Sequence, residues 1–203
     1  TKGRTNIKII LRRDDGESEA TDYKKYIQPY ERFEDIQKKA LKHARGRVLD
    51  IGVGGGKYSL YLQHQGLTVT GIDKSPYLIK LCKKRGLKDV RNMDLFKLNF
   101  GEEKFDTILL FGNGLSFGGS PKGLREFLSR LYTITSRNGI ILADSTDIRK
   151  TTRGLLAFKG RRQFKLRSEA NGEVGYWFTP FFVSDNQLKK IVHVTKWKIK
   201  RIY

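Results

Sequence analysis

The sequence predicts an α/β domain with a doubly wound, mostly parallel sheet, helices on both faces and a C-terminal β-hairpin addition. Three observations predict it. Short apolar runs alternate with helical patterns from Gly46 to about residue 144. Each run ends at a glycine or an aspartate, where a chain leaves a sheet. Two Ser-Pro pairs stand where helices should begin. Strands joined by helical crossovers pair in parallel, and such sheets are covered on both faces.

The first half of this pattern predicts three strands and two helices. Apolar runs predict strands over 47–51, 67–72 and 89–93. A helix is expected between the first two, over 57–65 and before Gly66. Another should begin at Ser75-Pro76, because a serine hydroxyl caps free backbone N–H groups and proline fits the first helical position.

The second half adds two strands and a longer helix. Strands are expected over 105–111 and 140–143, the latter ending at Asp144. Ser120-Pro121 repeats the helix start between them. Four apolar residues then follow at i, i+3, i+4 and i+7: Leu124, Phe127, Leu128 and Leu131. This spacing places them on one helix face, which should pack on the sheet.

The N-terminal segment predicts a short strand and then a helix. Apolar residues alternate over 7–11, and an acidic turn follows. Helical spacing then predicts burial for Phe33, Ile36, Ala40 and Leu41. Three nearby tyrosines are candidates for a lid, with half-buried packing as the alternative: Tyr23, Tyr26 and Tyr30.

The C-terminal segment has a different pattern. Residues 163–167 and 173–178 are predicted strands around Asn171-Gly172, a favourable hairpin turn pair. A capping-box pattern, Ser184 with Gln187, predicts a helix to about residue 194. A last strand is expected over 197–203.

Composition limits the class of protein. The 203 residues suit a single domain with a real core, divided into a cap segment (1–45), a core (46–148) and a C-terminal segment (149–203). One cysteine, Cys82, excludes an internal disulfide, a multi-cysteine zinc site and a cysteine-held iron–sulfur cluster. No apolar run approaches the roughly 18 residues of a membrane helix. With no secretory signal visible, the cytoplasm is the expected compartment.

Positive charge is in excess and unevenly placed. The chain has 41 Lys and Arg against 21 Asp and Glu, a net charge of +20. Residues 149–203 carry 14 of these bases and three acids. This favours a polyanionic partner such as RNA, or a solvated surface that keeps the chain soluble. Aromatic residues follow Arg161-Arg162 and Lys165 in the sequence: Tyr176, Trp177, Phe178, Phe181 and Phe182. They fit stacking on RNA bases, or alternatively they cover the sheet.

Ligands of open parallel sheets bind beyond the carboxyl ends of the strands, so residues 50–56 are the first candidate site. A phosphate-binding P-loop would need a glycine at position 51 and Ser or Thr at 58. Ile51 and Tyr58 exclude it. A dinucleotide fingerprint counted from Gly52 would need a glycine or alanine at position 57, where the chain has Lys57.

A third interpretation fits. Asp50-x-Gly52-x-Gly54-x-Gly56 after a buried strand resembles the first motif of the class I S-adenosylmethionine-dependent methyltransferases, of the small stand-alone prokaryotic type. Asp73 follows Gly52 by 21 residues and ends the second strand, where a carboxylate can accept hydrogen bonds from a ribose diol. The resemblance covers about residues 20–150.

Two later motifs extend the resemblance. Asp94 resembles the acidic residue that receives the adenine amino group in this family, and the N–H of Leu95 would meet the ring. Gly112 and Asn113 would line the methyl-transfer position. The resemblance implies S-adenosylmethionine as cofactor, S-adenosylhomocysteine as product, and these binding residues: Asp50, Gly52, Val53, Gly54, Gly56, Asp73, Lys74, Asp94, Leu95, Gly112 and Asn113.

The sequence departs from the family in two places. Residues 136–139, Ser-Arg-Asn-Gly, stand where many members have a Pro-Gly-Gly turn. The family sheet usually ends with an antiparallel seventh strand. Either the hairpin at 163–178 replaces that strand or the chain is trimmed.

The implied reaction is in-line transfer of a methyl group to an unidentified acceptor, a small molecule or RNA. Such a step depends on position and orientation, and a general base is optional. We therefore assign no catalytic residue. Two alternatives stay open: a nucleic-acid-binding module with a vestigial or regulatory cofactor pocket, and a nicotinamide-dependent oxidoreductase, which Lys57 disfavours.

The sequence lacks the residues that several other kinds of methyl transfer and metal chemistry require. Residues 112–115 do not form the Asn/Asp-Pro-Pro-aromatic motif of nucleic-acid amino methylation. Cytosine C5 chemistry needs a cysteine nucleophile, and Cys82 is expected to pack inside a helix instead. His43, His64 and His193 fall near predicted helix C-termini. No pair has metal-ligand spacing, so no metal is expected.

Overall fold

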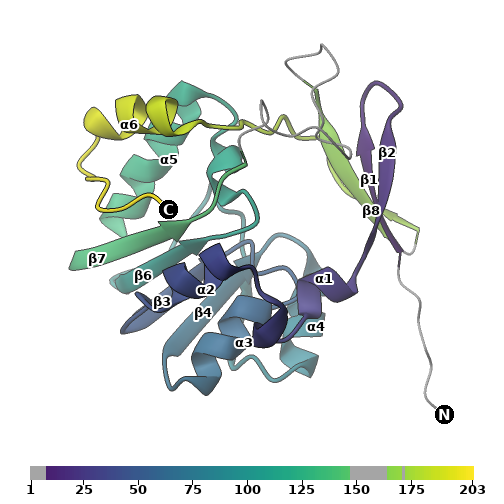
Figure 1. Cartoon of the computed structure of the whole chain (residues 1–203). Helices are drawn as coiled ribbons and strands as arrows, with labels where there is room; N and C mark the ends of the chain where they lie inside the picture. Colours follow the sequence, from purple (N-terminus) through teal and green to yellow (C-terminus); the bar gives the residue numbers. More distant parts are fainter. Residues whose placement is uncertain (1–7, 147–163, 171) are drawn as a thin grey trace.

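The computed structural model describes residues 8–146, 164–170 and 172–203. A five-stranded sheet forms the centre, in the order β5-β4-β3-β6-β7, and every pair is parallel. Its strands are β3 (Arg47–Ile51), β4 (Thr68–Asp73), β5 (Asp89–Asn92), β6 (Phe105–Leu110) and β7 (Thr135–Ala143). The predicted α/β fold is confirmed (Figure 1). The strand expected over 140–143 begins earlier, at Thr135.

Helices cover both faces of this sheet (Figure 1). One face packs against α5 (Pro121–Thr133) and α6 (Asp185–His193), and the other against α2 (Asp35–Leu41), α3 (Lys57–His64) and α4 (Pro76–Lys84). Strand residues alternate between the two cores. Leu49 and Ile108 face α5, whereas Val48 and Leu109 face α3. This period of two buries most side chains of the three central strands β4, β3 and β6.

The predicted helix starts are confirmed. The hydroxyl of Ser75 accepts a hydrogen bond from the N–H of Leu78 at 3.4 Å, and that of Ser120 from Gly123 at 3.0 Å. Ser184 and Gln187 form the expected capping box of α6. Each cap satisfies backbone donors that a helix leaves free at its first turn.

The N-terminal strands and the hairpin before α6 form a second, antiparallel sheet. It contains β1 (Lys8–Arg13), β2 (Ser18–Asp22), β8 (Leu166–Ala170) and β9 (Glu173–Val174), in the order β2-β1-β8-β9. It stands apart from the parallel sheet (Figure 1). The C-terminal hairpin therefore does not replace the seventh strand of the family sheet, because it pairs with β1.

Three details differ from expectation. The second hairpin strand shrinks to two residues, and Phe178 keeps only a bridge to Leu166. β2 was not expected, because its sequence has no apolar alternation. The strand predicted over 197–203 is wrong, since those residues have no regular structure. Trp197 instead donates its ring N–H to the carbonyl of Leu128 on α5 at 2.8 Å.

The burial predicted for Ile36 is also wrong: 43% of it is exposed. Phe33 does not belong to the helix. It ends the short 3₁₀ turn η1 (Tyr30–Arg32) in an extended conformation, and α2 begins only at Asp35. The helix phase is therefore set by its buried residues Gln37 and Leu41, which leaves Ile36 to the side. Among the helices of the described ranges, none is both long and apolar enough to cross a membrane.

We predict that Ser120→Ala lowers the free energy of unfolding by about 1 kcal/mol, the usual value of a serine cap. The loss should come from the unsatisfied N–H of Gly123. Ser129→Ala is the matched control, because Ser129 is exposed in the middle of α5, where alanine favours the helix. Urea denaturation followed by circular dichroism gives both values. Equal stability of the two variants would contradict the role of the cap.

Candidate functional site

The carboxyl ends of all five parallel strands lie at one edge of the sheet, and the predicted site residues follow four of them. The register places Ile51 beside Ile72, and Asp73 beside Asn92. The loop after β3 therefore lies next to the end of β4. The carbonyl oxygen of Ile72 accepts hydrogen bonds from the N–H groups of Gly52 and Val53, both at 2.9 Å. The structure thus brings the first two predicted motifs together.

The loop over residues 52–56 has a backbone that requires glycine. Gly52, Gly54 and Gly56 have φ angles of 76°, 54° and 76°, which favour glycine over other residues. At Gly55, a Cβ atom would lie 2.4 Å from the carbonyl oxygen of Tyr26. The short helix α1 (Lys24–Ile27) therefore packs directly against this loop. One face of the loop is covered by the N-terminal segment.

Asp50 is buried beneath the same loop. Only 2% of it is exposed, and the hydroxyl of Ser59 on α3 donates to its Oδ2 at 2.6 Å. Burial raises the pKa of Asp50 to about 6, against the opposing effect of the Ser59 hydrogen bond, and the charge of Asp73 raises it further. Asp50 has no access to a ligand in this position. Its carboxylate joins β3 to α3 on either side of the loop.

Asp73 holds the loop from the side. Its Oδ2 accepts from the N–H of Gly54 at 3.1 Å, and its Oδ1 accepts from the N–H of Ser75 at 2.9 Å. Partial burial raises its pKa, while these backbone hydrogen bonds act in the opposite direction. A carboxylate has about four acceptor positions, so two remain for a ligand. Asp73 is half-buried and can reach one.

Asp94 and Lys74 lie together at the next strand end. The ammonium of Lys74 is 3.6 Å from Oδ2 of Asp94, and the N–H of Phe96 donates to Oδ1 at 2.9 Å. The side-chain amide of Asn92 donates to the carbonyls of Asp73 and Lys74, at 3.0 and 2.9 Å. These contacts fix the loop after β5 against the loop after β4. Leu95 packs partly against the core.

Asn113 and Asp144 are joined by a hydrogen bond at the ends of β6 and β7. Asn113 has a φ of 64°, the one positive value among the described residues other than glycine. Its N–H donates to Oδ1 of Asp144 at 2.7 Å, and Gln37 of α2 donates to Oδ2 at 3.3 Å. The sequence marked Asp144 only as a strand end. Its carboxylate sets the conformation of the Gly112-Asn113 turn and links it to the N-terminal segment.

Arg85, at the end of α4, contacts the glycine loop and α1, which the sequence did not indicate. Its guanidinium donates to the carbonyl of Gly55 and, at 3.0 Å, to that of Ile27. It therefore ties α1 to the glycine loop. Nothing in the sequence separates it from the many other basic residues.

Cys82 and the three histidines, which we expected to have structural roles, lie within helices or at or just after their ends. Cys82 is buried in α4, donates to the carbonyl of Gly54 at 3.2 Å, and has a pKa raised by burial to about 11. A thiol in that state is a poor nucleophile. His64 and His193 end α3 and α6, and His43 follows α2. Within the described ranges, no group of three potential ligands could hold a metal ion.

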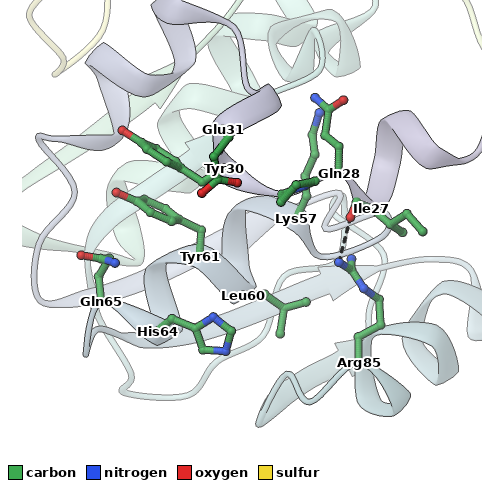
Figure 2. A pocket seen from close by; sticks show the side chains of 11 residues that line it. Ile27, Gln28, Tyr30, Glu31, Lys57, Leu60, Tyr61, His64, Gln65 and Arg85 are labelled. Carbon is green, nitrogen blue, oxygen red and sulfur yellow. Dashed lines mark hydrogen bonds between the residues drawn. The ribbon is translucent and has the colours of Figure 1, made fainter.

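A hollow of about 690 Å³ lies beside the glycine loop, on the outer side of α3 (Figure 2). It is lined by residues of the α1–η1 segment, of α3 and of the end of α4, among them Tyr30, Lys57, Tyr61, His64 and Arg85. None of the predicted cofactor residues lines it. Tyr30 and Tyr61 stack on one wall, with ring centroids 4.1 Å apart. Of the predicted lid tyrosines, Tyr30 thus packs at this outer surface, and Tyr26 packs over the loop.

Comparisons with known proteins agree with this geometry. A model of the family described as methyltransferase domain matches residues 48–139. A methyltransferase from Bacteroides fragilis, solved with S-adenosylhomocysteine, superposes with a TM-score of 0.78 and 26% identity over 92% of this chain and 78% of that one. The core of the chain, residues 48–139, is a methyltransferase domain of the class I S-adenosylmethionine-dependent type.

Other relatives match only part of this chain. A putative methyltransferase of a Geobacillus strain is 28% identical over 124 residues, 57% of this chain. The match spans only half, 50%, of that relative's length. The CcbJ methyltransferase from Streptomyces caelestis has the same fold, with a TM-score of 0.61 at 13% identity over 80% of this chain and 84% of that one. The predicted cofactor residues all lie within 48–139, and the second sheet lies outside it.

We predict a pH-dependent gain in stability for Asp50→Asn. The raised pKa means that folded wild type holds the Asp50 proton more tightly than the unfolded chain, so this group stabilises the fold below pH 4 and loses that effect as pH rises through about 6. Asparagine keeps the Ser59 hydrogen bond without charge. The variant's stability relative to wild type should therefore rise by roughly 2 kcal/mol between pH 4 and 7.

Denaturant unfolding across this pH range measures the difference. Asp35→Asn is the control, because the Asp35 side chain is 91% exposed and should show no such trend. A stability difference between Asp50→Asn and wild type that does not change with pH would contradict the raised pKa of Asp50.

Proposed function

We propose that this chain transfers a methyl group from S-adenosylmethionine to an acceptor by in-line displacement, leaving S-adenosylhomocysteine. The observation that carries the proposal is the hydrogen bond between Asp73 and the N–H of Gly54. It places a carboxylate that can bind a diol beside a glycine-rich loop, at the carboxyl edge of a parallel sheet.

The residues at this edge fit the proposed cofactor. Asp73 keeps free acceptor positions for the ribose hydroxyls. Asp94 already attracts a cationic N–H group, that of Lys74, and suits the adenine amino group. The open space around the Cα of Gly112, where a Cβ would meet nothing within 4 Å, suits the reacting end. We propose these residues, with Gly52, Val53, Gly54, Gly56, Leu95 and Asn113, as the binding site, and Asp50 as the support of its loop.

When bound, S-adenosylmethionine supplies a methyl group on a positively charged sulfur. The protein's own contribution is to position the two reactants and to exclude water. Asp144 contributes by fixing the Asn113 turn. We assign no general base.

The acceptor is proposed as a small molecule or RNA. RNA is supported by exposed basic residues on α6 and on the chain after it: Lys189, Lys190, Lys196, Lys198, Lys200 and Arg201. The bases of 147–163, including Arg161 and Arg162, lie outside the described residues. The chain is further proposed to form one domain over 1–203, which the pairing of β1 with β8 supports. The cytoplasm is the proposed compartment, supported by the single, unpaired cysteine.

We predict that the chain binds S-adenosylhomocysteine and not NADH in calorimetric titrations. Asp73→Ala should weaken S-adenosylhomocysteine binding at least tenfold, because it removes the diol acceptor and frees the N–H of Gly54. Asp35→Ala, which removes an exposed carboxylate on α2, is the matched control and should bind as wild type does. Unchanged affinity in Asp73→Ala would remove Asp73 from the site. NADH binding in place of S-adenosylhomocysteine would refute the proposed function.

We predict that a labelled-methyl screen against total RNA and metabolite extracts yields a labelled product. If RNA is the acceptor, its affinity should fall steeply between 50 and 200 mM salt, because phosphate contacts release counterions. A flat salt dependence would exclude the basic surface from RNA binding.

A further inference from the structure

The chain between β9 and α6 crosses the carboxyl edge of the parallel sheet. At one end, the ring of Tyr176 is 4.9 Å from the ammonium of Lys74, just after β4. Further on, the N–H of Phe181 donates to the carbonyl of Ser116, after β6, at 3.3 Å. Finally, Ser145, after β7, donates its hydroxyl to the carbonyl of Val183 at 3.0 Å. The sheet order is β4-β3-β6-β7, so the part between the first two contacts spans the end of β3.

That span fits the dimensions of the sheet. The ends of β4 and β6 are separated by one strand, about 10 Å. Five extended residues, from 176 to 181, reach about 16 Å. The end of β3 carries the glycine loop. The segment therefore passes over the mouth of the proposed cofactor site.

Three consecutive aromatic residues on this segment are exposed. The exposed fractions are 83% for Tyr176, 40% for Trp177 and 45% for Phe178. Their backbone is nevertheless held in place. Phe178 and Leu166 exchange both backbone hydrogen bonds, at 2.8 and 2.9 Å, and Gly175 donates to the carbonyl of Ser168 at 2.8 Å. Exposed aromatic rings on a held backbone at the mouth of a site indicate a contact surface, here with Tyr176 beside the end of β4 and Trp177 beside β8.

Cations hold two of these rings. Lys74 lies against Tyr176, and the guanidinium of Arg167 is 4.6 Å from the centre of the Trp177 ring. Both cations also have carboxylate partners, Asp94 at 3.6 Å and Glu169 at 2.6 Å. Their charge is thus largely balanced locally. The rings therefore present aromatic surface to a ligand, and the cations fix how the rings are oriented.

We propose that Tyr176 and Trp177 form a stacking ledge for the methyl acceptor, and that the acceptor carries a planar aromatic ring. The proposal rests on the proposed function and names the substrate class of that same site. A cation on one face of a ring draws π-electron density toward itself, so an electron-rich ring stacks favourably on the other face. A free small molecule and an unstacked nucleobase share this chemistry.

The test uses the full chain saturated with S-adenosylhomocysteine, so that ring probes cannot bind in the adenine position. The probes are catechol and uridine as free rings, oligouridylate as a nucleobase source, and cyclohexane-1,2-diol as the non-aromatic match of catechol. Quenching of Trp177 fluorescence and saturation-transfer NMR report binding. We expect the ring probes to bind and cyclohexane-1,2-diol not to bind. Binding of catechol alone assigns a free acceptor, and binding of oligouridylate alone assigns a nucleobase.

Tyr176→Ala and Trp177→Ala should each weaken ring binding by about tenfold, the usual size of a stacking contribution. S-adenosylhomocysteine affinity should stay unchanged. Tyr132→Ala is the matched control, because Tyr132 is also exposed (43%) and lies under a cation, Lys196, but on the outer side of α5.

Wild-type ring binding in the two ledge variants would overturn the proposal, as would a chain that binds no ring probe or binds both diols equally. In each case, intact S-adenosylhomocysteine binding would leave the proposed function standing. Failure of the unaltered chain to bind S-adenosylhomocysteine would instead contradict the proposed function, and the ledge with it.

Discussion

The hydrogen bond from the N–H of Gly54 to Asp73 is the contact on which the rest of the site depends. The loop over residues 52–56 lies beside Asp73 and above the buried Asp50, which binds the hydroxyl of Ser59. Asp73 joins the loop after β3 to the end of β4. Burial makes Asp50 costly to ionise, and the Ser59 hydrogen bond offsets part of that cost. The loop has glycines because α1 approaches its backbone closely and because its turns need positive φ angles. A side chain at Gly55 would displace α1.

The cover over this loop is built from both ends of the described chain. Residues 9–13 pair with 166–170, so the second sheet closes only when distant parts of the sequence meet. α1 continues from this sheet to the loop, where Arg85 ties it down, and the aromatic segment continues from it across the strand ends. The proposed cofactor site and the proposed acceptor ledge thus lie in different parts of the fold. The family model matches 48–139, which contains the proposed cofactor residues and excludes the second sheet and the ledge.

The predicted elements of the core are right because local signals decide them. Ser75 and Ser120 each cap the helix that their sequence pattern marks, and the strands buried on both faces are short, mainly apolar runs. The errors lie where distant contacts decide. The segment 197–203 alternates like a strand, yet Trp197 finds its partner on α5. β2 has polar residues and forms because β1 offers an edge. Asp144 acts through Asn113 and Gln37, a link that no spacing in the sequence reveals.

Among the described residues, the exposed bases of α6 and the aromatic ledge lie on different surfaces. Exposed lysines on α6 and after it lie on the α5 side of the sheet, whereas the cations at the ledge are paired with carboxylates. At physiological salt, charges act over about 8 Å, so the lysines can attract a polyanion to the molecule without ordering a ring at the site. Ring stacking depends little on salt. An RNA acceptor would therefore need both surfaces and show both dependences, whereas a small acceptor would need only the ledge.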